Sequence, residues 1–187
     1  MSTESIDGVE YNSDLTKIIK VDPSDISTEN IIIEEWVEEL SVRSFFYCRF
    51  ISNVKLSKKL KRIGDWCFEG CANLQSIKCY GKLEYVGAGA FYNCSSLNSE
   101  TLNNKIKALY QLTFAACVNL KKIKIPSSVL SINSSCFKRC YSLIEVEYSG
   151  VKYKCQYDAL NDVILIEGLG AFDGMSGGKL KSLPSIK

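Results

Sequence analysis

Phenylalanine returns every 23 residues through the middle of this chain, with no insertion or deletion between one occurrence and the next. The five positions are Phe45, Phe68, Phe91, Phe114 and Phe137. Three residues after each stands a cysteine, at Cys48, Cys71, Cys94, Cys117 and Cys140. Aliphatic residues recur three residues after each cysteine, and five and eight residues before each phenylalanine. One unit this short cannot bury its own apolar side, so the period predicts a stack of similar coils.

Each period contains two kinds of apolar spacing. The segment Leu120–Ile125 reads L-x-x-I-x-I, and its last three residues alternate as in a short strand. A turn follows, marked by Pro126 in this period and by Gly81 in an earlier one. The segment Asp65–Cys71 is compact, and its Phe and Cys are three apart, which fits one helical or 3₁₀ turn. We therefore expect an α/β repeat protein, a right-handed solenoid of short parallel strands and short helical or 3₁₀ turns.

The repeat resembles the BspA-type leucine-rich repeat, whose pattern is roughly I-G-x-x-A-F-x-x-C-x-x-L followed by x-x-I-x-I-P. The segments that carry the resemblance are Ile63–Leu74, Val86–Leu97 and Leu120–Pro126. The sequence departs from the pattern at Glu100, Tyr110 and Asn133, and Glu100 puts the third strand in question. The resemblance implies a leucine-rich-repeat solenoid with its strands on the concave face. It also implies a group that includes many surface antigens and adhesins.

The two ends of the chain are less regular than the middle. We expect an acidic cap over residues 1–27, in which Leu15–Val21 forms a strand, and five coils over residues 28–150. Residues 151–187 allow two interpretations. In one, Leu160, Val163 and Ile166 continue the columns into a degraded sixth coil; in the other, Val151–Cys155 and Val163–Ile166 pair as a hairpin. Gly170–Met175 then begins a further coil or belongs to a tail.

The nine cysteines suggest packing more than chemistry. The period stacks five of them into a buried ladder, where cysteine behaves as a small apolar residue. Structural disulfides are the alternative, although parallel side chains do not suit disulfide geometry. The chain has no histidine and no C-x-x-C pair, so we expect no metal site and no cofactor. Catalytic motifs are also missing, and we expect no enzymatic activity.

Charge is distributed unevenly along the chain. Residues 1–40 carry a net charge of −9, and residues 41–187 carry +11. The acidic segment can neutralise the basic body, or the body can bind an anionic partner. Few aromatic residues lie outside the buried column, so we expect no nucleic-acid binding. No apolar run is long enough to cross a bilayer, so we expect no membrane span.

The polar side chains of the strands are the candidate binding site. By resemblance they face solvent on the concave side. The candidates are Asn53, Lys55, Ser76, Lys78, Tyr80, Thr101, Lys122, Lys124, Glu145 and Glu147. The row Lys55, Lys78, Thr101 and Lys124 predicts a basic stripe for an acidic protein surface; the alternative is an ordinary solvated face.

The expected function is that of a monomeric binding module for a protein of unknown identity. By resemblance it is a surface antigen or adhesin, whose partner is a host or extracellular-matrix protein. Residues 1–14 do not resemble a secretory signal and the cysteines are odd in number, which favours an intracellular scaffold instead. The sequence leaves both locations open.

Overall fold

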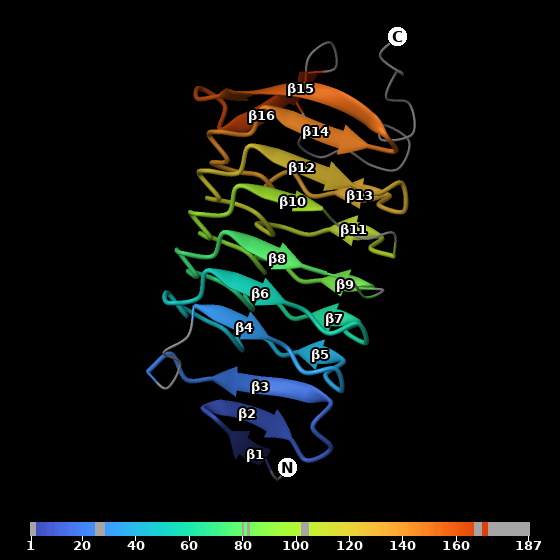
Figure 1. Cartoon of the computed structure of the whole chain (residues 1–187). Coiled ribbons are helices and arrows are strands. Elements are labelled where there is room, and N and C mark those ends of the chain that lie inside the picture. Colours follow the sequence, from blue (N-terminus) through green and yellow to red (C-terminus); the bar gives the residue numbers. More distant parts are fainter. Residues whose placement is uncertain are drawn as a thin grey trace.

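The computed structural model describes residues 3–24, 29–79, 81, 83–101, 105–166 and 170–171. The chain winds into stacked coils, and the strands of these coils lie in two rows (Figure 1). The first row contains β4 (Asn30–Ile32), β6 (Asn53–Lys55), β8 (Ser76–Lys78), β10 (Ser99–Thr101), β12 (Lys122–Ile125) and β14 (Glu145–Tyr148). The second row contains β5 (Glu39–Leu40), β7 (Arg62–Ile63), β9 (Tyr85–Val86), β11 (Ala108–Leu109) and β13 (Ser131–Ile132). We call the outward side of the first row the strand face.

Parallel pairing joins coils at the spacing that the sequence period predicts, in two groups: β4 to β9 form one, and β10 to β14 form the other. In the first row Asn53 pairs with Ser76, and Lys122 pairs with Glu145, each 23 residues further along. In the second row Leu40 pairs with Ile63 at the same spacing. The strand β10, which Glu100 put in question, forms and pairs with β12. A solenoid of parallel strands is therefore the fold of this chain, while its hand and the curvature of the strand face stay predictions.

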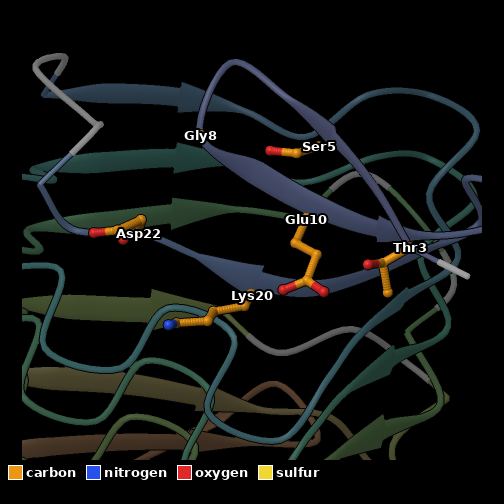
Figure 2. Close-up of a pocket in the computed structure, with 6 residues that line it drawn as sticks. All are labelled: Thr3, Ser5, Gly8, Glu10, Lys20 and Asp22. Carbon is orange, nitrogen blue, oxygen red and sulfur yellow. The ribbon is translucent and has the colours of Figure 1, made fainter.

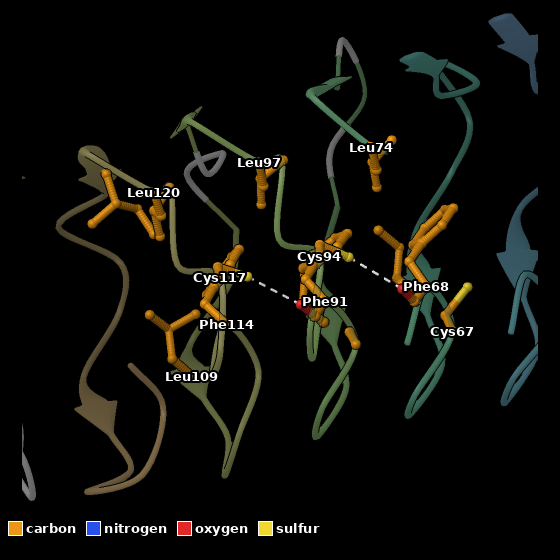
Figure 3. Close-up of a cluster of buried hydrophobic side chains, with 14 of the residues drawn as sticks. Cys67, Phe68, Leu74, Phe91, Cys94, Leu97, Leu109, Phe114, Cys117 and Leu120 are labelled. Atoms are coloured by element: carbon orange, nitrogen blue, oxygen red, sulfur yellow. Dashed lines mark hydrogen bonds between the residues drawn. The ribbon is translucent and has the colours of Figure 1, made fainter. Parts of the chain in front are cut away.

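The core is built from columns of side chains that occupy the same repeat position in successive coils (Figure 3). The phenylalanine rings stack from coil to coil, with centroids 5.5 Å apart for Phe68 and Phe91 and 5.2 Å apart for Phe91 and Phe114. In the cysteine column, each residue after Cys48 donates its S–H to the backbone carbonyl of the phenylalanine one coil earlier. Cys94, for example, donates to Phe68 at 3.1 Å. The same bond recurs from Cys71, Cys117 and Cys140. The same carbonyls also accept the amide three residues further on, as Phe68 does from Cys71 at 3.2 Å, so each thiol adds a second hydrogen bond to a buried carbonyl oxygen.

The structure does not support the predicted helical or 3₁₀ turns opposite the strands: the described residues contain strands and turns and no helix. In the first coil the amides of Ser44, Phe46 and Cys48 donate to carbonyls three residues back. The amides between them donate instead to the next coil, as Phe45 does to Cys67 at 2.9 Å. A helix needs every amide to bond within its own segment, and here every second one joins two coils.

Left-handed residues permit this alternation. In the first four coils the residues two before and two after the column phenylalanine have positive φ, for example Arg43 at 57° and Tyr47 at 56°. In two of these coils one of the positions is glycine, at Gly70 and Gly89. The amide of the left-handed residue donates to the neighbouring coil, as Arg43 does to Asp65 at 3.0 Å, and the amide that follows it donates three residues back, so the segment is a run of turns.

At the N-terminus an antiparallel sheet closes the solenoid. It consists of β1 (Thr3–Ile6), β2 (Val9–Asn12) and β3 (Lys17–Val21), and β3 then runs parallel to β5. The expected strand at Leu15–Val21 is thus one of three. Asp7 and Gly8 both have positive φ and make the tight turn between β1 and β2.

At the C-terminus the strands also turn antiparallel. The long strand β15 (Val151–Asp158) pairs with β14 over its first four residues and with β16 (Val163–Ile166) over its last four. The short strand β17 (Gly170–Ala171) follows. This is a hairpin and not a sixth coil, although only Cys155 of the segment Val151–Cys155 pairs with β16. The expectations for Thr28, Tyr80 and residues 172–175 lie outside the described residues.

Candidate functional site

The strand face carries two rows of strand positions, and the paired register places these positions opposite one another within β4, β6 and β8 and within β10, β12 and β14. One row runs through Asn30, Asn53 and Ser76 and continues through Ser99, Lys122 and Glu145. The other runs through Ile32, Lys55 and Lys78 and continues through Thr101, Lys124 and Glu147. The structure thus places the predicted binding residues in rows across the coils, except Tyr80, which is not among the described residues.

Hydrogen bonds order the N-terminal half of the first row. The side-chain amide of Asn53 donates to Oδ1 of Asn30 at 3.0 Å, and the hydroxyl of Ser76 donates to Oδ1 of Asn53 at 2.8 Å. These side chains are therefore held in fixed positions before any partner arrives.

Ion pairs cover the C-terminal half of the face. Lys122 Nζ lies 3.7 Å from Glu145, and Lys124 Nζ lies 2.7 Å from Glu147. Lys152 of β15 adds a second cation 3.4 Å from Glu145. The predicted basic stripe is therefore interrupted, because the carboxylates of β14 neutralise its C-terminal end.

Lys55 and Lys78 form the open part of the stripe. They lie directly opposite each other on β6 and β8, both exposed. In the part of the chain that the structure describes, neither has a carboxylate within salt-bridge distance. Ile32 extends the row on β4, and 66% of its surface is exposed. This half of the face offers two cations beside an apolar side chain.

The cysteines have the properties of core residues. All nine lie in the described part of the chain, and no disulfide joins any two of them there. Burial raises the pKa of Cys48 and of Cys67 to about 12. These thiols stay protonated at neutral pH, and a protonated, buried thiol is a poor nucleophile.

Other surface hollows give little indication of chemistry. The hollow of Figure 2 lies on the N-terminal sheet, where Glu10 of β2 faces Lys20 of β3 and Thr3, Ser5 and Asp22 complete a polar lining. Among the described residues no group of three or more Cys, Asp or Glu side chains is placed to hold a metal ion. A search of the same residues finds no helix of the length and hydrophobicity that a membrane span requires.

Sequence reasoning missed a set of exposed apolar residues in the first coil. Val42, Phe46, Tyr47 and Phe50 all project from the turns between β5 and β6. The repeat contains the signal, which is a difference between coils. At the same four positions the second coil has no large apolar residue but Asp65, Glu69, Gly70 and Asn73.

Parallel strands repeating every 23 residues, a phenylalanine column and a polar strand face define a leucine-rich-repeat protein. The chain belongs to the family of BspA type leucine rich repeat regions, which matches residues 23–144 in six copies. The leucine-rich repeat is a protein–protein interaction module, and no catalytic family is indicated.

Solved structures of bacterial proteins share the fold. A leucine rich cell surface protein from Faecalibacterium prausnitzii is 28% identical, with a TM-score of 0.75 over 80% of this chain and 40% of its own. The pneumococcal vaccine antigen PcpA is 20% identical, with a TM-score of 0.57 over 76% of this chain and 41% of its own. A leucine rich repeat protein of T. pallidum is 20% identical, with a TM-score of 0.56 over 74% of this chain and 78% of its own.

The chain thus spans less than half the length of the first two of these proteins. Among curated proteins, none matches it.

Proposed function

We propose that this chain is a non-enzymatic, monomeric module that binds an acidic protein surface through the strand face. The observation that carries the proposal is the contrast between the two halves of that face. Lys124 is matched by Glu147, whereas Lys55 and Lys78 stand opposite each other without a carboxylate among the described residues. Like charges directly opposite on a sheet are destabilising, and an acidic partner would remove that repulsion. The ordered Asn30–Asn53–Ser76 row beside them supplies fixed hydrogen-bonding groups.

The test is a reversal of both charges. The variant Lys55→Glu/Lys78→Glu is assayed by biolayer interferometry against a panel of immobilised extracellular-matrix proteins. We expect at least a tenfold loss of affinity for any protein that binds the unmodified chain, with an unchanged denaturation midpoint. We also expect the affinity of the unmodified chain to fall with added salt.

A matched control keeps the net charge the same. Lys59→Glu/Lys107→Glu makes the same change at two exposed lysines outside the strand face. Equal losses in the two double variants would show a general charge effect and would reject the strand face as the site.

We also propose a location at the cell surface, on the likeness to the Faecalibacterium cell surface protein. A second candidate, an intracellular scaffold, is favoured by the nine thiols without a disulfide. Labelling of intact cells with a membrane-impermeant amine reagent separates the two. Labelled protein supports the surface location, and protein that is labelled only after lysis supports the scaffold.

A further inference from the structure

The first coil exposes apolar side chains at positions where the second coil is polar. Val42 and Phe50 are 60% and 63% exposed, and the rings of Phe46 and Tyr47 are exposed beside them. We call Val42, Arg43, Phe46, Tyr47, Arg49 and Phe50 the first-coil patch.

The repeat provides an internal comparison for this patch. At the positions of Val42, Phe46 and Phe50 the second coil has Asp65, Glu69 and Asn73. The solenoid forms with these polar residues one coil further on, so stacking does not require apolar ones. Tyr47 differs, since a Cβ on Gly70 would lie 3.0 Å from its ring; this ring packs on the next coil. Val42, Phe46 and Phe50 therefore have no comparable role in holding the coils together.

A hollow of about 560 Å³ lies where the patch meets the N-terminal sheet. Its walls are Val42, Arg43, Phe46 and Tyr47 on one side and residues of β2, β3 and the following turn on the other; these are Glu10, Ile19, Lys20, Val21 and Pro23. A hollow with this lining can accept a large apolar side chain from outside.

Two arginines at the patch indicate the charge of the partner. The guanidinium of Arg43 lies 5.1 Å from the ring centroid of Phe46, and that of Arg49 lies 5.1 Å from that of Tyr47. Stacking on a ring fixes a guanidinium and leaves its N–H edge available for a carboxylate. Among the described residues neither arginine is in an ion pair. The nearby acids are Glu10 and Glu69, and neither carboxylate lies within salt-bridge distance of an arginine.

We infer that the first-coil patch is a docking site for a protein segment that presents a large apolar side chain flanked by carboxylates. The apolar side chain occupies the hollow between the first coil and β3, and the carboxylates bind the edges of Arg43 and Arg49. This site is distinct from the strand face, and its test does not depend on the function proposed there.

The probe is a library of random twelve-residue peptides displayed on phage and selected against the full chain. We expect selected peptides to share Leu, Phe or Trp next to at least two acidic residues. Their affinity is then measured for Val42→Asp/Phe46→Glu/Phe50→Asn, which introduces the residues of the second coil. We expect at least a tenfold loss, with an unchanged circular dichroism spectrum and denaturation midpoint.

Two further variants separate the contributions. Arg43→Gln/Arg49→Gln should weaken the same peptides about fivefold and remove most of their salt dependence. Lys55→Glu/Lys78→Glu should leave their affinity unchanged, because it alters the strand face alone.

Three results would overturn the inference: a selection that yields no peptides, selected peptides that lack the acidic and apolar pattern, or selected peptides that bind the triple variant and the unmodified chain with equal affinity. A second copy of this chain is the other candidate occupant of the patch, and sedimentation equilibrium tests it by measuring the oligomeric state. A dimer that the triple variant converts to monomer would assign the patch to self-association instead.

Discussion

At the residue scale, glycine is required where an aromatic ring from the previous coil lies on the backbone. Gly89 has a φ of 58°, and a Cβ there would lie 2.2 Å from the indole of Trp66. Gly150 also has positive φ, at 81°, but a Cβ would meet nothing within 4 Å. The pair separates the cost of the backbone conformation from the cost of the clash.

We expect Gly89→Ala to lower the free energy of unfolding by at least ~2 kcal/mol, because it adds the clash to the left-handed strain. Gly150→Ala should cost only about 1 kcal/mol, for the strain alone. Urea titration of both variants measures the difference. Equal losses would show that the Trp66 ring can move aside without cost.

Buried thiols make the stability of the chain sensitive to alkaline pH. Burial raises the pKa of Cys67 from 9.0 to about 12 in the folded chain, so the folded state retains a proton that the unfolded state releases. Stability from this group is complete below pH 9 and is lost as the pH rises toward 12. At pH 10 the loss is on the order of 1 kcal/mol for one fully buried thiol.

The variant Cys67→Ala tests this linkage, since Ala90 occupies the same position one coil later. We expect the decrease in unfolding free energy between pH 8 and pH 10 to be smaller in the variant by about 1 kcal/mol. Parallel pH profiles for the two proteins would mean that this thiol ionises as readily in the folded chain as in the unfolded one.

At the element scale, a coil is stable only through its neighbours. Phe91 contacts the rings of Phe68 and Phe114 at nearly parallel angles of 6° and 17°, so its ring belongs to two interfaces. Phe91→Ala should therefore cost ~3–5 kcal/mol and weaken both adjacent coils. Denaturant titration measures the loss, and a value below ~1 kcal/mol would mean that the column contributes little.

The elements differ in how well the sequence predicted them. The 23-residue period fixed the strand positions and the pairing partners, because a period without insertions leaves one register. The spacing of three between Phe68 and Cys71 did not distinguish a helical turn from the observed turns, because it says nothing of where the amides between them donate. The Asp7–Gly8 and Ser149–Gly150 pairs are typical hairpin signals and could have predicted both terminal sheets.

The candidate site stays a prediction, and the sequence-based expectation did not match the charges that neighbouring coils bring together. Residues 23 apart lie opposite each other, so Lys124 and Glu147 could have been matched from the sequence alone. The first-coil patch needed the fold, since only the structure shows which apolar residues of a repeat remain exposed.

At the scale of the whole molecule, one continuous core runs from the N-terminal sheet to the C-terminal hairpin. It includes Tyr11 near one end, Ile166 near the other and seven of the nine cysteines. The two remaining cysteines, Cys79 and Cys155, are half-buried. The reactivity of the thiols therefore measures how well the core is buried along the whole stack of coils.

Counting thiols before and after denaturation tests the central claim, that the repeat columns form this buried core. Natively isolated protein is reacted with a chromogenic thiol reagent with and without guanidinium chloride. We expect no more than two thiols, those of Cys79 and Cys155, to react in the folded protein, and all nine to react after unfolding. Rapid reaction of the column cysteines in the folded protein, or fewer than nine thiols after unfolding, would contradict the account.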